Sequence, residues 1–140
     1  MNLDIELVNG GKLPQEFNKS AGFDLYTNEK IILKPYAIAK IATGIKIQPE
    51  SNDYYMRIVP RSSTSKNYPL YVPEGTIDSD YNGEVFIVVR NLSGKQFEIP
   101  RYSRIAQMVP VYRPSVKVRI VSKLRDTARG ANGFGSTGTN

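Results

Sequence analysis

Apolar and polar residues alternate in short segments along most of the chain, which is the pattern of strands that bury one face. Residues 2–8 show it first, with Leu3, Ile5 and Leu7 on one face and Asp4 and Glu6 on the other. We expect further strands over residues 21–26, 31–33, 37–47, 54–59, 96–99, 104–112 and 116–121. No segment combines a sustained helical period with capping residues, and glycine and proline separate the short strands. The pattern therefore predicts an all-β sandwich or barrel.

The stretch that carries the most chemistry is residues 75–84, GTIDSDYNGE. Asp78 and Asp80 are spaced i, i+2, so in an extended strand they project from the same face. Asn82-Gly83 precedes an apolar run, which is a strong short-range signal for a hairpin. We therefore expect a hairpin that holds Asp78 and Tyr81 near its tip, where a carboxylate can activate water and a tyrosine ring can pack on a sugar or base. Asp80 and Asn82 are equally well explained as turn formers.

Polar residues stand out at three other places near the expected strands. Asp24 lies between two apolar residues, which a solvent-facing position would explain. Residues 60–67, PRSSTSKN, favour one helical turn capped by Ser62. Free backbone N–H groups there, together with Arg61, would form an anion site, unless the segment is an ordinary polar loop. Gln107 is an amide in an apolar strand, where it bonds either main chain or a ligand.

The character of the chain changes from residue 122 onward. Residues 129–138, RGANGFGSTG, are rich in glycine and almost free of core residues, as in a flexible tail. The same residues include an arginine, a lone phenylalanine and Ser-Thr between glycines, which a phosphate-gripping flap would use. Gly-rich phosphate loops usually precede a helix and none is expected here, so this is not a Walker or dinucleotide motif. A disordered tail and a flap both remain open at this point.

Composition narrows the chemistry that is available. The chain has 140 residues, 40% hydrophobic and 23% charged, which suits one folded domain. It contains neither His nor Cys, which excludes Ser-His and Cys-His nucleophile pairs and argues against a zinc site. A catalytic base must then be Asp, Glu, Lys or Tyr. Any metal would be a hard cation held by oxygen atoms, such as Mg²⁺.

Charge and cysteine content bear on partners and location. The net charge of +6 suits an anionic partner such as nucleic acid, a membrane surface or a small polyphosphate. The basic residues are spread along the chain, which argues against a disordered nucleic-acid arm. The chain lacks cysteine, a signal-peptide layout and an apolar run long enough for a bilayer. We therefore expect a cytoplasmic protein with no membrane association.

Together, five segments of the sequence resemble the motifs of the trimeric dUTPase family, in that family's order. They are AGFDLY at 21–26, PRSST at 60–64, GTIDSDYNGE at 75–84, RIAQ at 104–107 and RGANGFGSTG at 129–138. The resemblance implies an enzyme that hydrolyses dUTP to dUMP and pyrophosphate with Mg²⁺, which limits uracil in DNA and supplies dUMP for dTMP synthesis. It also implies a jelly-roll-like, distorted β-barrel catalytic domain over residues 1–121. A flexible Gly-rich tail over residues 122–140 would close over the active site of a homotrimer whose sites are each built from three subunits.

The same resemblance assigns roles to the central stretch. Asp78 matches the base that orients and activates the water that attacks the α-phosphorus. Tyr81 matches the tyrosine that packs on the deoxyribose and leaves no room for a 2′-hydroxyl group. The backbone of Gly75, Thr76 and Ile77 is implied to read the uracil edge by hydrogen bonds.

Other residues are implied to handle the metal and the phosphates. Asp24 matches a carboxylate that is linked to magnesium through water. Arg61, Ser62 and Ser63 match the second motif, which contacts phosphate and supports the base. Gln107 matches an amide that is directed at the phosphates.

The tail supplies the last group of implied contacts. Arg129, Ser136 and Thr137 resemble residues that contact the terminal phosphates. Phe134 resembles the ring that stacks over uracil, and Gly135 lies beside it in the same motif.

Two departures and two alternatives belong with the resemblance. The second motif more often reads PRSG, so Ser63 stands where glycine is usual. The fourth motif more often has Gly-Asp before its arginine, where this chain has Tyr102-Ser103, and Arg104 is left outside the expected site. A dCTP deaminase shares the fold but favours Glu in the central hairpin, where this chain has Asp78. A non-catalytic protein that binds a protein or nucleic acid through its basic surface is the other alternative, although we expect no stable nucleic-acid binding.

Overall fold

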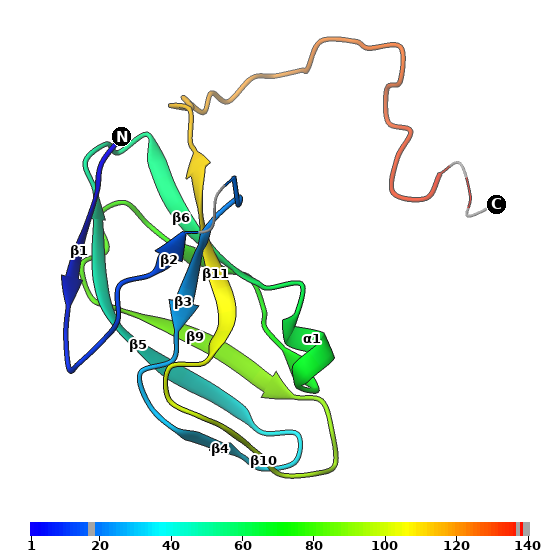
Figure 1. Cartoon of the computed structure of the whole chain (residues 1–140). Helices are drawn as coiled ribbons and strands as arrows, with labels where there is room; N and C mark the ends of the chain where they lie inside the picture. The colour runs from blue at the N-terminus through cyan, green and yellow to red at the C-terminus, as the bar shows by residue number, and fades with distance from the viewer. Residues whose placement is uncertain (17–18, 137, 139–140) are drawn as a thin grey trace.

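All strands of the computed structural model, which describes residues 1–16, 19–136 and 138, lie within the first 112 residues (Figure 1). In chain order they are β1 (Leu3–Leu7), β2 (Gln15–Glu16), β3 (Phe23–Tyr26), β4 (Ile31–Leu33), β5 (Ile38–Pro49), β6 (Tyr54–Pro60), β7 (Leu70–Tyr71), β8 (Gly75–Ile77), β9 (Glu84–Asn91), β10 (Phe97–Ile99) and β11 (Arg104–Tyr112). The helical content of the described residues is one turn, α1 (Thr64–Asn67). The predicted all-β class is therefore confirmed. Within the described chain, no helix is long and apolar enough to cross a membrane.

Two antiparallel sheets enclose the core. One has the strand order β1-β5-β9-β7 and the other β2-β3-β11-β6-β8, while β10 pairs with β4. The inward face of β9 shows how the alternating pattern forms this core, since Val85, Ile87 and Val89 are all 0% exposed. Leu25, Met108 and other apolar residues of the second sheet belong to the same buried cluster. Burial of these side chains is the main stabilising term of the fold.

The hairpin expected around residues 75–84 is not formed. β8 pairs with β6 in one sheet, whereas β9 pairs with β5 and, at its end, with β7 in the other sheet. Residues 78–83 therefore cross between the sheets, and the N–H of Tyr81 donates to the carbonyl of Asp78 at 3.1 Å in the turn. The turn signal was correct, but the pairing of the flanking strands is decided by distant partners. Asp78 directly follows β8 and does not lie inside a strand.

The predicted helical turn after β6 is present, but Ser62 is not its cap. α1 starts at Thr64 with Ser63 at the N-cap position, and the Ser63 side chain makes no capping hydrogen bond. A hydrogen bond to β11 fixes the turn instead, because the buried Thr64 hydroxyl donates to the carbonyl of Ile105 at 2.7 Å. A tertiary contact has decided the start of the helix, so local capping preference did not locate it.

The strand expected over residues 116–121 is also absent. Val116, Val118 and Ile120 are 75%, 87% and 101% exposed, and the segment pairs with no strand in the described part of the chain. From Arg113 onward the chain leaves the barrel (Figure 1), and we call residues 113–140 the C-terminal segment. An alternating pattern needs a partner edge before it forms a strand, and this chain alone does not supply one here. The domain division between residues 121 and 122 stays a prediction.

Tyr102 stands where the resemblance would place glycine, and the structure shows how it is accommodated. Its backbone has φ of 65°, in the left-handed region that favours glycine. The hydroxyl donates to the carbonyl of Gly10 at 2.9 Å. The Lys12 ammonium and the Arg101 guanidinium lie 4.2 and 4.5 Å from the ring centroid. These contacts hold the side chain and offset the backbone strain.

Candidate active site

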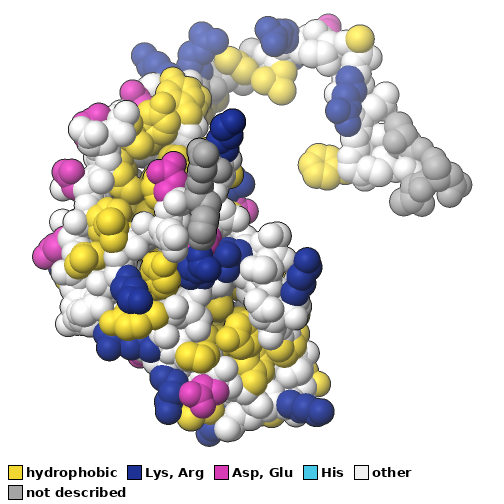
Figure 2. Space-filling model, viewed as in Figure 1, with side chains coloured by type: hydrophobic (Ala, Val, Ile, Leu, Met, Phe, Trp, Pro, Cys, Tyr) yellow, Lys and Arg dark blue, Asp and Glu magenta, His cyan; other side chains and the backbone are white. Residues whose placement is uncertain are grey.

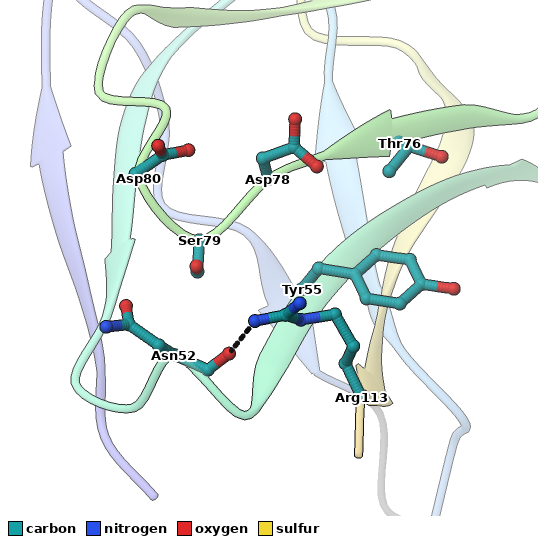
Figure 3. A pocket seen from close by; sticks show the side chains of 7 residues that line it. All are labelled: Asn52, Tyr55, Thr76, Asp78, Ser79, Asp80 and Arg113. Carbon is teal, nitrogen blue, oxygen red and sulfur yellow. Dashed lines mark hydrogen bonds between the residues drawn. The ribbon is translucent and has the colours of Figure 1, made fainter. Parts of the chain in front are cut away.

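Asp78 lies on the wall of a polar cavity of about 630 Å³ at the end of β8. The cavity is lined by Asn52, Tyr55, Thr76, Asp78, Ser79, Asp80 and Arg113. Figure 3 shows Asp78, Ser79 and Asp80 on one wall and Asn52 and Arg113 on the opposite wall. None of the ion pairs between described residues includes Asp78 or Asp80. An exposed carboxylate in a cavity of this kind is able to accept a proton from water.

A second cavity, of about 280 Å³, lies between β8 and β9 and also includes Asp78. Its lining comprises Lys40, Thr76, Ile77, Asp78, Tyr81, Glu84, Phe86 and Val88. Because β8 and β9 belong to different sheets, their facing backbone edges are not joined by a ladder. Such free N–H and C=O groups can recognise the edge of a flat heterocycle.

Tyr81 lines this second cavity and is held in place by a hydrogen bond. Its hydroxyl donates to the carbonyl of Glu84 at 2.8 Å, and the residue is 43% exposed. A Cβ atom on Gly83 would lie 2.5 Å from the Tyr81 hydroxyl, so the ring position requires glycine there. Asp78 and Tyr81 are therefore brought together as expected, although by a crossover between sheets.

Asp24 lies in a separate cluster on β3 and is buried, contrary to the solvent-facing interpretation. It is 7% exposed. Its Oδ1 atom lies 2.9 Å from Nε of Arg61, and its Oδ2 atom lies 3.4 Å from Nη1 of Arg104. Two guanidinium groups offset the cost of burying this carboxylate.

Arg104 is the residue of this cluster that sequence reasoning left out. Its Nη1 donates to Gln15 Oε1 at 3.3 Å as well as to Asp24, and its carbonyl accepts from Nη1 of Arg61 at 2.8 Å. β11 pairs with β3 so that Arg104 lies opposite Tyr26 and Gln107 opposite Asp24. Asp24 and Arg104 are 80 positions apart in the sequence, so no local pattern could show that they are partners.

The remaining residues of the second and fourth motifs surround the same cluster. The Gln107 amide donates to the carbonyl of Pro60 at 3.2 Å, so it bonds main chain, the first of the two possibilities left open. Ser62 is exposed and Ser63 is half-buried, directly after the loop that carries Arg61. The hydroxyl and amide groups here lie beside a guanidinium and could contact an anion.

The two clusters lie at opposite ends of β6. Ile77 pairs with Met56, so Asp78 continues opposite Tyr55, whereas Arg61 follows Pro60 at the other end. Six residues of strand at about 3.3 Å per residue separate these points by about 20 Å. Within one chain the Asp78 cavity and the Asp24 cluster are therefore separate sites.

The tail residues are not brought to either cluster. Phe134 is fully exposed, and the Arg129 guanidinium bonds the carbonyl of Asn132 within the tail itself. Gly135 and Ser136 take part in a local turn in which the Ser136 hydroxyl accepts from the N–H of Gly133 at 2.7 Å. Thr137 lies outside the described residues.

Charge is distributed unevenly between the barrel and the C-terminal segment. That segment holds six of the 19 Lys and Arg residues and, through Asp126, one of the 13 Asp and Glu residues. It therefore carries +5 of the net charge of +6, and the barrel is close to neutral. Figure 2 shows Lys and Arg side chains spaced along the segment, with hydrophobic side chains between them. A mobile ligand with several negative charges would be attracted to this part of the molecule.

Comparison with known proteins gives a consistent result. The family model described as dUTPase matches residues 11–138. The deoxyuridine 5′-triphosphate nucleotidohydrolase of Nautilia profundicola is 39% identical over 142 residues, which covers 99% of each chain. That of Clostridium novyi is 42% identical over 127 residues and covers 89% of this chain and 88% of its own.

A solved structure with a similar fold was also found. The structure of the Staphylococcus bacteriophage 80alpha dUTPase with dUPNHPP has a TM-score of 0.90 at 25% identity, and 99% of each chain is covered. The predicted jelly-roll-like form of the all-β fold is thereby confirmed.

Proposed function

The chain belongs to the dUTPase family and catalyses the hydrolysis of dUTP, and we propose that Asp78 activates the attacking water in sites shared between three subunits. The observation that carries this proposal is the position of Asp78, which lines both the large polar cavity and the second cavity between β8 and β9, which we call the slot. A nucleotide with its base in the slot would place its sugar and α-phosphate beside this carboxylate.

Recognition of the base and the sugar follows from the slot. The backbone of Gly75, Thr76 and Ile77 offers its free edge to the O2, N3 and O4 edge of uracil. Tyr81 packs on the deoxyribose, and its hydrogen bond to Glu84 keeps the ring where a 2′-hydroxyl group would collide with it. Exclusion of ribonucleotides is thus a steric effect of a fixed ring.

The chemical step needs one base. Asp78 accepts a proton from water, the water oxygen forms a bond to the α-phosphorus, and the bond from that phosphorus to the α,β-bridging oxygen breaks. The products are dUMP and pyrophosphate. Phosphoryl transfer depends mostly on positioning and charge neutralisation, so one carboxylate is sufficient.

The phosphates require positive charge and hydrogen-bond donors. Arg61, Ser62 and Ser63 supply them from the Asp24 cluster, and Arg61 is in turn oriented by its ion pair with Asp24. The Gln107 amide, which donates one N–H to Pro60, keeps its second N–H for a phosphate oxygen. The Asp24 carboxylate also fits a water-mediated contact to Mg²⁺, because each of its oxygens accepts from one guanidinium and retains a further lone pair. Mg²⁺ held mainly by the substrate phosphates would neutralise charge on them.

The separation of the clusters favours sites shared between subunits, and the family resemblance implies that there are three. The backbone at Asp78 and at Arg61 is about 20 Å apart along β6, and the Arg61 guanidinium is paired with Asp24, so the phosphate ligands of the same chain lie far from a water that Asp78 activates. The same ligands on a neighbouring subunit are not subject to this limit. An exposed apolar area on β5, β7 and β9, with Ile38 at 70%, Tyr71 at 54% and Val88 at 42% exposure, is a surface that a neighbouring subunit could cover.

The unpaired segment at residues 116–121 supports the same arrangement. It alternates valine or isoleucine with Lys117 and Arg119, whereas the edge strand β1 alternates leucine or isoleucine with Asp4 and Glu6. Pairing of this segment with β1 of another copy would set apolar residues together on one face and opposite charges on the other. The missing strand would then form only in the oligomer.

The tail completes the site in this proposal. Arg129, Ser136 and Thr137 contact the terminal phosphates, and Phe134 stacks on the uracil with Gly135 as a hinge beside it. The exposure of Phe134 in the free chain suits a ring that is buried only after the nucleotide binds. Cytoplasmic residence is part of the proposal, since a chain without cysteine suits a reducing compartment.

The test is pyrophosphate release with Mg²⁺ from dUTP, compared with dTTP, dCTP and UTP. We expect release from dUTP alone and a loss of at least about 1000-fold in Asp78→Asn, which removes the base and keeps the side-chain shape. Full activity of Asp78→Asn would refute the role of Asp78. Release of ammonia from dCTP would indicate the deaminase alternative instead.

A further inference from the structure

Arg113 joins two features of the molecule that are otherwise separate. It is the first residue after β11, where the C-terminal segment leaves the barrel. It also lines the large cavity, on the wall opposite Asp78 and Asp80 (Figure 3). The root of the C-terminal segment and the expected catalytic base therefore border the same space.

The root is anchored by Arg113 through both its backbone and its side chain. Its N–H donates to the carbonyl of Asp53 at 2.6 Å, and its Nη2 donates to the carbonyl of Asn52 at 3.3 Å. One residue earlier, the Tyr112 ring meets the Tyr54 ring edge-on with centroids 5.6 Å apart. These contacts tie the end of β11 to the turn that precedes β6.

Pro114, the next residue, restricts the direction in which the chain leaves Arg113. Pro114 has a fixed φ and no N–H, and it restricts the preceding residue to extended conformations. The orientation of the Arg113 backbone therefore determines the direction in which the C-terminal segment departs. The backbone contact with Asp53 and the guanidinium contact with Asn52 thus place the start of the segment and one wall of the cavity through a single residue.

We propose that Arg113 is a positioning residue for dUTP hydrolysis, which couples the direction of the C-terminal segment to the shape of the Asp78 cavity. The inference rests on the proposed function, because it takes this cavity as part of a shared site and the tails of the subunits as covers of those sites. Arg113 holds one wall of the Asp78 cavity and the start of the C-terminal segment in place, and it has no proton to transfer. Its loss should therefore lower kcat more than it lowers substrate affinity.

The experiment compares Arg113→Gln and Arg113→Lys with Arg125→Gln. Arg125→Gln is the matched control, since it removes the same charge from the same segment at a position that lines neither cavity and lies outside the strand expected over residues 116–121. In Arg113→Gln we expect kcat for dUTP to fall about 10-fold while KM changes less than about threefold. Arg113→Lys can still donate to Asn52 and should recover part of the loss, and Arg125→Gln should behave as the unmodified chain.

Two further readouts separate coupling from loss of folding. Amide hydrogen exchange in residues 50–56 should be about 10-fold faster in Arg113→Gln, with an unchanged midpoint of urea unfolding. The chain has no tryptophan, so Phe134→Trp introduces a single indole that reports closure of the tail on a non-hydrolysable dUTP analogue. Its fluorescence change should be smaller in the Arg113→Gln background than in the Arg125→Gln background.

The outcomes distinguish this inference from the proposed function. Equal kcat and equal exchange in Arg113→Gln and Arg125→Gln would overturn the inference, as would a rise in KM with unchanged kcat. If the unmodified chain hydrolyses no dUTP, the proposed function fails. In that case the exchange comparison still decides whether Arg113 anchors the segment, and faster exchange in Arg113→Gln would support the anchoring.

Discussion

Asp24→Asn tests whether the buried charge cluster stabilises the fold. The substitution keeps the shape of the side chain and removes the charge that faces Arg61 at 2.9 Å and Arg104 at 3.4 Å. Breaking a fully buried ion pair costs about 3–5 kcal/mol, and an exposed pair contributes about 0–1 kcal/mol. The side chains of Arg61 and Arg104 keep 23% and 34% exposure, so water can partly compensate. We therefore expect the free energy of unfolding to fall by about 2 kcal/mol.

The measurement is urea unfolding followed by far-UV circular dichroism, at one fixed protein concentration because subunit association adds to the stability. Asp53→Asn is the control, since Asp53 is exposed between β5 and β6 and takes part in none of the ion pairs between described residues. It should change the free energy of unfolding by less than about 0.5 kcal/mol. A value for Asp24→Asn that matches Asp53→Asn would refute the reasoning.

Three other substitutions or deletions follow from close contacts and exposure. Gly11→Ala would place Cβ 2.1 Å from the backbone oxygen of Gly44, so we expect a loss of about 2 kcal/mol in urea unfolding; unchanged stability would contradict this contact. Gly83→Ala would place Cβ 2.5 Å from the Tyr81 hydroxyl and displace the ring, so steady-state kinetics should show weaker discrimination of dUTP from UTP. Undiminished discrimination would show that the ring does not exclude ribose. Deletion of residues 122–140 should lower kcat about 100-fold. Unfolding of the barrel should stay unchanged, since the described hydrogen bonds of these residues are internal to them. Full activity of the deletion variant would show that the tail is not needed for hydrolysis.

The part of the fold that sequence could predict is the part set by local alternation. The strand expected over residues 104–112 coincides with β11, and that expected over 31–33 coincides with β4. The crossover at residues 78–83 could not be predicted, because Asn82-Gly83 specifies a turn but not the strands that the flanking residues join. Residues 116–121 have a correct strand pattern but lack a partner in the same chain.

The candidate site likewise contains a part that local sequence predicts and a part that depends on strand pairing. Motif residues such as Asp78 and Tyr81 are close in sequence, and the structure places them together. The burial of Asp24 and the part played by Arg104 depend on the register of β3 against β11, which no local pattern contains. Arg113 is in no motif, and only the shape of the cavity draws attention to it.

Subunit complementation tests the central claim most directly. Asp78→Asn and Arg61→Gln are each expected to abolish dUTP hydrolysis, with folding of both variants checked by circular dichroism. The two variants are then unfolded together at equal concentration and refolded. If each site takes Asp78 from one subunit and Arg61 from a neighbour, a site is intact when the first subunit is the Arg61→Gln variant and the second is the Asp78→Asn variant. Random assembly should then restore about a quarter of the unmodified activity. Activity no higher than that of the separately refolded variants would contradict shared sites and place base and phosphate ligands within one chain.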